Sequence, residues 1–515
     1  MMNLLTESVF RVRTPEGAAT ASLPEILALL GEDRVESLLG LQRHQEDAFH
    51  IFCCYLAGAV LVRQKETAPR QSTAFWIEGI RALTRQEGCE DDSAWMLVVD
   101  DPTKPAFMQP PVLDQTDFAR RYQLKTVTPD GLDVLITARN HDVKAVRAEH
   151  ADVDAWIFAL INLNGTVGYG GRANYGVARM NSGSGSRPRV GWLATLRIGG
   201  QFAKDVSTLL LARNRLLLLP HGYDSNGKVL LWIPPWDGER SHALKDLDPF
   251  FIEVARRTRL LSHDKGIKAF SAGSSVGLIA AEEQKGNLGD PWIPITQRTN
   301  GALTVPKSGF TPERLRDLIF GEGYTQAAMQ VVDHGMTSGW FSASVLVGGN
   351  CTTDGFQSAT LRVPEKPQLA ICGGGQARDR LATLSKKGID MAADIQRKAL
   401  RPALLSLMEG GPVTPNEKNK DVTRWSDDVV KAYSQQWTPL FFDWLWTTVD
   451  IPDDADALRP WFIELRRRAQ DILELALYCT PQRHGRAYRA KTKAQGIFFG
   501  GLKKNFPNFM EVTHD

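Results

Sequence analysis

The residues best suited to hold another molecule lie in one segment, Gly165–Trp192, with the sequence GTVGYGGRANYGVARMNSGSGSRPRVGW. This segment contains eight glycines and four arginines. Glycine lets the backbone approach another molecule closely and adopt positive φ, and arginine pairs with phosphates. Tyr169, Tyr175 and Trp192 could stack on bases or sugars. The segment therefore indicates a nucleic-acid site around Gly168–Gly171, and the alternative is a surface loop without a binding role.

The familiar phosphate-binding and catalytic motifs are missing from the sequence. No G-x-G-x-x-G or G-x-x-x-x-G-K-[ST] occurs, so a dinucleotide site or a P-loop is not supported. Ser182, Ser184 and Ser186 alternate with glycine, but the G-x-S-x-G setting of a serine hydrolase is absent. We therefore predict that the protein is not an enzyme and needs no cofactor.

Two His-Asp doublets leave one enzymatic alternative open. His141-Asp142 and His263-Asp264 are residue types that ligate metal, as in a metal-dependent phosphohydrolase. The remaining histidines show no metal-ligand spacing, and two doublets among ten histidines can arise by chance. We therefore expect no metal site, and an unrelated nucleic-acid-binding scaffold remains the third possibility.

Charge is unevenly distributed along a chain whose net charge is only +2. No Asp or Glu occurs from Ala155 to Lys204, where the chain average predicts about six. Basic residues in this tract are Arg172, Arg179, Arg187, Arg189, Arg197 and Lys204. A second acid-free tract, Leu475–Met510, contains Arg483, Arg486, Arg489, Lys491, Lys493, Lys503 and Lys504. Both tracts predict positive surfaces that face a polyanion, and the alternative is a pair of solvated faces.

Composition places the chain among ordinary globular proteins. Its 515 residues allow roughly two to four domains, with 43% hydrophobic and 23% charged residues. No signal peptide is visible, and the apolar stretch within Phe49–Val62 is shorter than the roughly 20 residues that span a bilayer. None of the six cysteines forms a C-x-x-C pair, and adjacent Cys53 and Cys54 have the setting of packing residues. We expect a cytoplasmic protein without a membrane partner.

The elements that must position these residues are mixed helices and strands up to about residue 375. Gln42–Val62 has a helical pattern, whereas Leu216–Leu219 and Val229–Ile233 flank turn residues and predict a hairpin. Ser344–Val347 and Thr360–Val363 predict two further strands.

After Gly373-Gly374-Gly375 the pattern becomes helical. Ser426 is a predicted N-cap of a helix that reaches Trp446 and kinks at Pro439. A last helix is expected near Arg486–Phe498. Helical spacing joins Ile395, Ala399, Ala403 and Leu407, and also Leu458, Phe462, Leu465, Ala469, Ile472 and Ala476. The predicted fold is therefore α+β, with a large mixed domain at 1–375 and a four-helix bundle at 376–515.

The segment Gly348–Ser358, GGNCTTDGFQS, predicts a hairpin tip from which Phe356 and Gln357 project. A side chain at a rigid tip can act as a wedge between base pairs. The residues by themselves favour an ordinary hairpin with a packed Phe356.

Taken together, these segments resemble the large subunit of the type I-E CRISPR surveillance complex, Cascade, known as the CasA family. The matching motifs, in the family's order, are MNLLTESVFRVR at 2–13, Pro105–Gln109, Gly168–Gly171, Gly348-Gly349 with Gln357-Ser358-Ala359, and the helical C-terminus. The chain departs from some members in lacking a cysteine zinc cluster at about 255–300.

The resemblance implies a non-catalytic subunit that reads a protospacer-adjacent motif in the minor groove of duplex DNA and opens the duplex for guide RNA pairing. A glycine loop, a lysine finger and a glutamine wedge do this in the family. The implied DNA-binding residues are Gly168, Tyr169, Gly170, Gly171, Arg172, Lys285, Phe356, Gln357 and Ser358. Lys265 and Lys268 are alternative fingers. The minor groove offers a degenerate code, which suits a backbone loop and a few long side chains.

The resemblance also implies partners. The stretch Thr137–Ala151 occupies the place of a loop that docks on the 5′ end of the guide RNA and on a neighbouring subunit. Its RNA-facing groups would be Arg139, Asn140, His141 and Lys144. Further implied partners are target double-stranded DNA, the backbone, small and 5′-handle-binding subunits of Cascade, and a separate helicase–nuclease.

Overall fold

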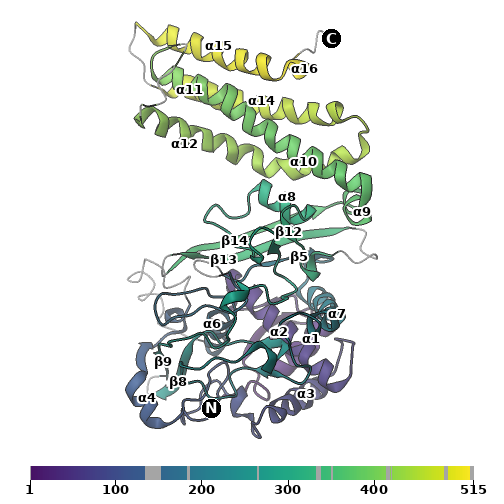
Figure 1. The fold of residues 1–515 in the computed structure, drawn as a ribbon, viewed down its shortest axis with the longest axis vertical. Helices are drawn as coiled ribbons and strands as arrows, with labels where there is room; N and C mark the ends of the chain where they lie inside the picture. The colour runs from purple at the N-terminus through teal and green to yellow at the C-terminus, as the bar shows by residue number, and fades with distance from the viewer. Residues whose placement is uncertain are drawn as a thin grey trace. The chain divides into compact units, whose positions relative to one another are not determined.

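The chain forms two compact units, which are described separately (Figure 1). The computed structural model describes residues 2–133, 152–181, 186–263, 266–331, 338–349, 352–412, 414, 418, 420–480 and 485–510. The first unit is Met1–Phe310 with Gly321–Arg362, and the second is Thr311–Phe320 with Val363–Asp515.

Helix α2 (Arg43–Gln64) is the centre of the first unit, as predicted for Gln42–Val62. It is buried on nearly all sides from Ala48 to Leu61, because it packs against α3, α6 and α7. Cys53 and Cys54 are fully buried in it, which confirms their packing role. The other α-helices among the described residues of this unit are α1 (Leu23–Gly31), α3 (Thr73–Gln86), α4 (Gln115–Arg121), α6 (Val153–Gly165) and α7 (Ile198–Leu217).

Small sheets surround this helical centre. Their strands are β1 (Phe10–Thr14), β2 (Gly17–Ala21), β3 (Ser37–Leu38), β4 (Gln123–Thr126), β5 (Arg189–Leu193), β6 (Lys228–Leu230), β7 (Leu247–Ile252), β8 (Arg257–His263), β9 (Gly266–Ala272), β10 (Ile295–Thr296), β11 (Gly301–Ala302), β12 (Tyr324–Thr325), β13 (Gly339–Gly349) and β14 (Thr352–Val363). The sheet orders are β2-β1-β3, β11-β10-β12, β14-β13-β5, β4-β9-β8 and β6-β7. The two long strands β13 and β14 are the clearest of these in Figure 1.

The predicted hairpin between Leu216–Leu219 and Val229–Ile233 is wrong. Leu216 belongs to α7, whose buried face also includes Phe202, Val206 and Leu209 at helical spacing. The strand after the turn, β6, pairs in parallel with β7 instead. The apolar run at 216–219 is short, so its periodicity alone could not separate a helix end from a strand.

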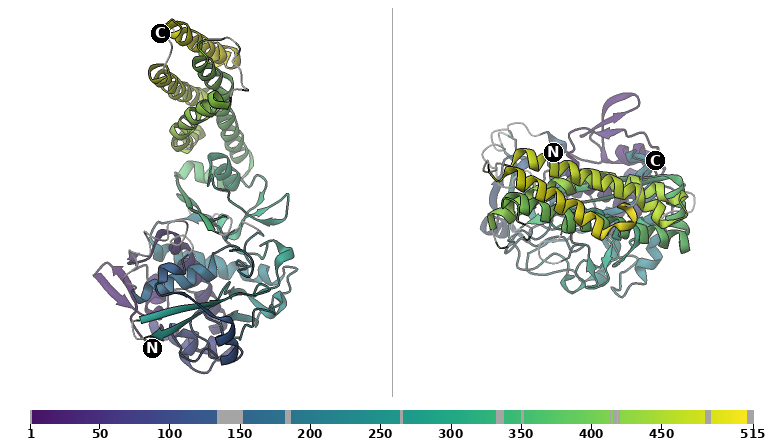
Figure 2. Two further views of the ribbon diagram at one scale, coloured as in Figure 1. Left: turned by 90° about the vertical axis from the view of Figure 1, so that its left-hand side faces the viewer. Right: turned by 90° about the horizontal axis from the view of Figure 1, so that it is seen from above.

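The second unit is helical (Figure 2). Its helices are α8 (Pro312–Phe320), α9 (Glu365–Gly373), α10 (Gly375–Ile395), α11 (Arg401–Met408), α12 (Lys420–Trp437), α13 (Phe441–Thr447), α14 (Asp454–Cys479), α15 (Ala487–Asn505) and α16 (Pro507–Met510). A π-helical turn, Gln396–Leu400, joins α10 to α11. The four long segments that pack together are α10–α11, α12, α14 and α15, so the predicted fold class is confirmed.

The apolar stripes predicted for this unit are buried, including Ile395, Ala399 and Leu407. The chain breaks at Pro439 as expected, between α12 and α13. Ser426 is not an N-cap, because it lies inside α12, where its hydroxyl donates to the Thr423 carbonyl at 2.8 Å. The predicted division at 375 comes later than the change of unit at Val363, since α9 already packs on α10.

Candidate nucleic-acid interface

A closed loop, Val167–Val177, presents the glycines that the sequence singled out, and we call it the glycine loop. The Val177 amide donates to the Val167 carbonyl at 3.1 Å, and the Gly170 amide donates to the Asn174 carbonyl at 2.8 Å. Gly168 is buried, whereas Tyr169, Gly170 and Arg172 are exposed. Gly171 has φ of +101°, in the left-handed region that favours glycine. The exposed tip therefore combines the bare backbone of Gly170 with the side chains of Tyr169 and Arg172.

Gly176 lets the two arms of the glycine loop approach each other. A Cβ atom at Gly176 would lie 2.7 Å from the Gly168 carbonyl carbon and 2.5 Å from the Met180 sulfur. No side chain fits at that distance, so this position needs glycine for space. The resulting close contact brings Met180 underneath the loop.

Asn164, at the end of α6, links the glycine loop to the core. Its Nδ2 donates to the Met108 carbonyl at 3.2 Å, and its Oδ1 accepts from the Arg256 amide at 3.0 Å. The Arg256 guanidinium in turn donates through Nη2 to the Gly168 carbonyl at 2.8 Å. The Pro105–Gln109 segment is thus a buried structural support. Neither Asn164 nor Arg256 was predicted, because nothing in their local sequence marks them.

The other side of the glycine loop rests on the residues that follow β9. The Ser274 amide donates to the Ala173 carbonyl at 3.1 Å, and the Tyr175 hydroxyl donates to the Ser275 carbonyl at 2.7 Å. The rings of Tyr169 and Tyr175 meet edge to face, with centroids 6.2 Å apart. Tyr169 is 42% exposed, so its ring remains available for stacking.

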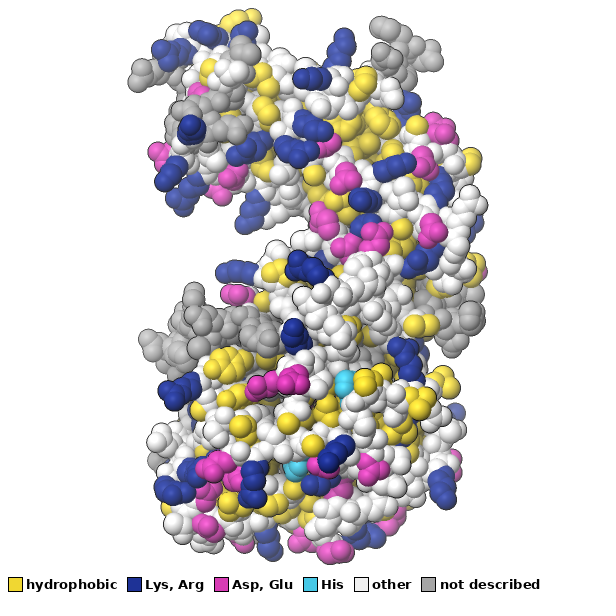
Figure 3. Space-filling model, in the orientation of Figure 1, with side chains coloured by type: hydrophobic (Ala, Val, Ile, Leu, Met, Phe, Trp, Pro, Cys, Tyr) yellow, Lys and Arg dark blue, Asp and Glu magenta, His cyan; other side chains and the backbone are white. Residues whose placement is uncertain are grey.

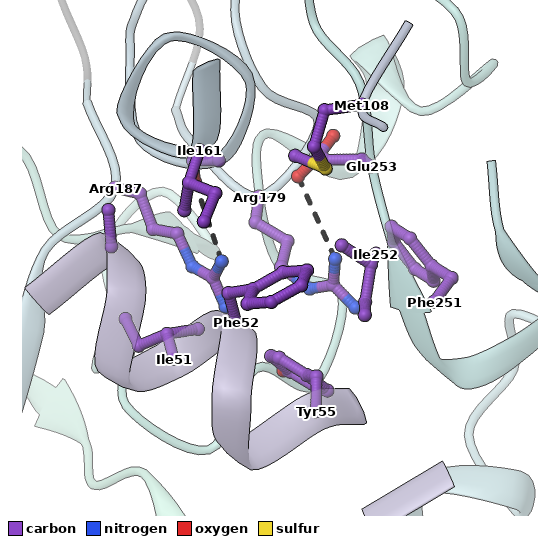
Figure 4. Close-up of a pocket in the computed structure, with 12 residues that line it drawn as sticks. Ile51, Phe52, Tyr55, Met108, Ile161, Arg179, Arg187, Phe251, Ile252 and Glu253 are labelled. Carbon is purple, nitrogen blue, oxygen red and sulfur yellow. Dashed lines mark hydrogen bonds and ion pairs between the residues drawn. The ribbon is translucent and has the colours of Figure 1, made fainter. Parts of the chain in front are cut away.

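Two arginines of the first acid-free tract are buried below the glycine loop and not on a surface. Arg187 Nη2 lies 2.5 Å from Asp290 Oδ2, and Arg179 lies 3.7 Å from Glu253. The Arg179 guanidinium also stacks over Phe251 at 3.5 Å, and both guanidinium groups point toward α2 in Figure 4. Arg179 and Arg187 are therefore not part of the positive surface that was predicted for this tract.

The rest of that tract is also largely neutralised by acids from distant segments. Arg189 pairs with Asp47 at 2.9 Å, and Lys204 lies 3.6 Å from Asp205. The exposed Arg197 pairs with Asp33 at 3.2 Å. Arg172 is the one basic residue of the tract that is exposed and has no carboxylate partner among the described residues. The predicted positive surface thus reduces to the tip of the glycine loop.

The second acid-free tract does form an exposed basic face, on α15 and the turn before it. The residues concerned are Arg486, Arg489, Lys491, Lys493, Lys503 and Lys504, all exposed. In the described part of the chain, no carboxylate pairs with them. Figure 3 shows many Lys and Arg side chains over the C-terminal helices. Arg483 lies outside the described residues.

One cluster has the residue types of a catalytic triad but not its geometry. His50 Nε2 lies 2.8 Å from Asp205 and 3.5 Å from Cys54 Sγ, so one ring nitrogen serves both neighbours. A triad needs the two different nitrogens. All three side chains are buried, and burial raises the pKa of the Cys54 thiol well above its usual value. This cluster ties α2 to α7 and is not a nucleophilic site.

Of the four residues in the two His-Asp doublets, the structure describes only His263. His263 ends β8 and is exposed, whereas His141, Asp142 and Asp264 lie outside the described residues. Within the described ranges, no group of three His, Cys, Asp or Glu side chains could hold a metal ion. No helix in those ranges is both long and apolar enough to cross a membrane.

Comparison with known proteins shows what this arrangement is similar to. No protein-family model and no curated protein sequence matches the chain. Among solved structures, "CRISPR-associated protein Cse1 from Acidimicrobium ferrooxidans" matches with a TM-score of 0.63 at 16% identity, covering 99% of both chains. CasA from Thermus thermophilus matches with a TM-score of 0.62 at 15% identity, covering 98% of this chain and 99% of that chain. Thermobifida fusca Cse1 matches with a TM-score of 0.62 at 12% identity, covering 99% of both chains. The chain has the CasA fold.

Within the CasA fold, Lys285 lies beside the segment that leaves the glycine loop. Its carbonyl accepts from the Ala302 amide at 2.9 Å, and the Ala302 carbonyl accepts from Asn181 Nδ2 at 3.3 Å. The following residue, Gly286, abuts the Met180 backbone. Lys285 is exposed, whereas Lys268 is half-buried on β9 and Lys265 lies outside the described residues.

Phe356 and Gln357 do not project from a turn, contrary to the prediction. Both lie within β14, half-buried, and the Thr353 hydroxyl already donates to the Val347 carbonyl across the hairpin at 2.7 Å. Gly355, with φ of +106°, is accommodated inside the strand. The Gln357 side chain packs against Gly309, and Ser358 is exposed. Several nearby glycines could have formed the turn, so the sequence could not select it.

The sheet β14-β13-β5 contains the end of the glycine-rich segment and the strand of Gln357. β5 includes the last residues of that segment, Arg189–Trp192, and β14 carries Gln357. Asp47 of α2 fixes this sheet by accepting from Arg189 of β5 and from the Ser344 hydroxyl of β13, at 2.9 and 2.5 Å. The residues predicted to dock on the guide RNA, Arg139, Asn140, His141 and Lys144, lie outside the described residues.

Proposed function

We propose that this chain is the non-catalytic large subunit of a type I-E CRISPR Cascade complex. The observation that carries the proposal is the glycine loop, which exposes Gly170 at its tip and is held at Gly168 by Arg256 within a CasA fold. A chain of a "CRISPR RNA-guided surveillance complex" also matches, with a TM-score of 0.58 at 12% identity over 97% of this chain. The implied partners are guide RNA and the other Cascade subunits, in the cytoplasm.

The glycine loop and Lys285 read a protospacer-adjacent motif from the minor groove of duplex DNA. The backbone at Gly170 and Gly171 approaches the base edges, since neither residue carries a side chain of its own. Gln357 then helps to open the duplex, with Phe356 and Ser358 beside it. Exchange of a DNA duplex for a guide–target heteroduplex is nearly balanced, so a small push by the protein decides whether it starts. A helicase–nuclease is recruited afterwards, since this subunit breaks no bond.

Assembly comes first among the tests. Purification of the chain from its host is expected to recover guide RNA and several partner proteins in fixed ratio. The assembled complex is then expected to bind a library of duplexes according to the motif flanking the target. A chain that purifies without RNA, or a complex that binds all flanking motifs equally, would contradict the proposal.

Matched variants then test the reading residues. Gly171→Asp should abolish motif-dependent binding, whereas Gly17→Asp, which adds the same charge at another positive-φ glycine, should not. Gln357→Ala should slow duplex opening, whereas Gln123→Ala on β4 should have no effect. If Gly171→Asp binds like Gly17→Asp, Gly171 has no reading role. If Gln357→Ala opens the duplex as fast as Gln123→Ala, Gln357 is not the wedge.

A further inference from the structure

Arg256 occupies an unusual position directly behind the glycine loop. Its Nη2 donates to the Gly168 carbonyl at 2.8 Å, and its Nη1 donates to the Ala255 carbonyl at 3.1 Å. A Cβ atom on the exposed Gly170 would lie 3.3 Å from that same Nη2. The guanidinium therefore supports the part of the loop that faces outward.

The charge of Arg256 is not balanced locally. Among the described residues no carboxylate lies within ion-pair distance of it, and burial lowers its pKa to about 10, so it stays charged at neutral pH. The neighbouring Arg257 pairs with Asp117 at 3.2 Å. Arg259 is fully buried and donates to four backbone carbonyls. Arg256 differs from both, because its side chain is only partly covered and two carbonyl acceptors leave part of its five donors unused.

We propose that Arg256 is a nucleic-acid contact of the glycine loop, with two roles. It positions Gly168, and it supplies an uncompensated positive charge that binds a phosphate of the DNA strand lying over Gly170. This inference rests on the proposed function and adds to it a residue that the motif resemblance does not include. A charge-assisted contact to phosphate adds affinity without adding sequence preference, so Arg256 complements the reading done by the loop backbone.

The first experiment measures duplex binding by the assembled complex over a range of salt concentrations. Arg256→Gln removes the charge, and because its amide nitrogen ends two bonds short of Nη2 it also loses the hydrogen bond to the Gly168 carbonyl. It is expected to bind roughly five- to tenfold more weakly, with a salt slope lower by about one. Arg256→Lys keeps the charge and should recover most of the affinity. Arg85→Gln, which removes an exposed charge on α3, is the matched control and should bind like the parent.

The second experiment measures how firmly the glycine loop is held in the absence of DNA, from its rate of cleavage by trypsin. Trypsin cleaves after exposed arginines, and Arg172 stands at the tip of the loop. Arg256→Met, which loses both hydrogen bonds, is expected to be cut after Arg172 several-fold faster than the parent, as mapped by mass spectrometry. Arg256→Lys should be cut after Arg172 at nearly the parental rate, because its longer side chain can still donate to the Gly168 carbonyl.

The outcomes separate this inference from the proposed function. A parent complex that reads its motif while Arg256→Gln shows parental affinity and salt slope would overturn the charge role of Arg256 alone. Parental cleavage rates in Arg256→Met would overturn the positioning role. A parent that shows no motif-dependent binding would overturn the proposed function, and the inference with it.

Discussion

Arg187 Nη2 lies 2.5 Å from Asp290 Oδ2, and both side chains are buried under the segment that leaves the glycine loop. Asp290 also lies 3.5 Å from Arg179 Nε, so one carboxylate serves two buried guanidinium groups. A buried ion pair adds little net stability, but removal of one partner leaves an uncompensated charge. This relationship makes the base of the loop sensitive to a single change.

Asp290→Asn is expected to lower the free energy of unfolding by about 3 to 5 kcal/mol, because two buried cations lose their shared carboxylate. Urea denaturation followed by tryptophan fluorescence measures this. The control is Glu239→Gln, which breaks the partly exposed pair with Arg121 and should cost less than about 1 kcal/mol. Similar losses of unfolding free energy in both variants would contradict the prediction that the buried ion pairs of Asp290 matter more than an exposed pair.

Glu87 predicts a pH dependence of stability in the first unit. Its carboxylate accepts from the Val229 and Leu230 amides at 2.6 and 2.9 Å, but burial dominates and raises its pKa from 4.5 to about 7. The folded state therefore holds this proton more tightly than the unfolded state, and stability contributed by Glu87 falls as pH rises from 4.5 to about 7.

Glu87→Gln should remove most of that fall, which is on the order of 3 kcal/mol. Urea midpoints of parent and variant, measured across this pH window, provide the test. Parallel pH profiles for the two proteins would rule out Glu87 as the titrating group.

The basic face of α15 predicts sequence-independent binding of nucleic acid. Arg489→Glu should weaken DNA binding equally for all flanking motifs and reduce its salt dependence, since the contact is to phosphates. Lys366→Glu changes the charge by the same amount on α9, where Lys366 pairs with Asp450, and serves as control. A loss that depends on the motif would place Arg489 in motif reading instead.

Cysteine reactivity tests whether the cluster of His50, Asp205 and Cys54 lacks a reactive nucleophile, as its geometry indicates. Cys53 and Cys54 are fully buried, and burial raises the pKa of both thiols, whereas Cys479 is exposed. Iodoacetamide should therefore modify Cys479 in the native protein and leave Cys54 unmodified until the chain is unfolded. Rapid native labelling of Cys54 would reopen the question of a nucleophile beside His50.

Features set by neighbouring residues could be predicted from the sequence. The helix at Gln42–Val62 and the apolar stripe from Leu458 to Ala476 follow from hydrophobic periodicity, and the structure confirms both. The exposed basic residues of α15 were also found, because a helix with one apolar face must turn its charged face to solvent. The errors at Leu216 and at Gln357 arose where a short run or a cluster of glycines allowed two local structures.

The sequence by itself determined the helical bundle, the central helix and the glycine-rich segment, since these depend on composition and spacing within short stretches. Only the tertiary structure decided which charges remain available. Arg187 and Asp290 are far apart in the chain, yet they meet in the core, so an acid-free tract is not a positive surface. Arg256 is the opposite case. It lies outside both acid-free tracts, yet it contacts Gly168 with no carboxylate beside it among the described residues. Burial and pairing are set by contacts between distant segments, and local composition does not contain them.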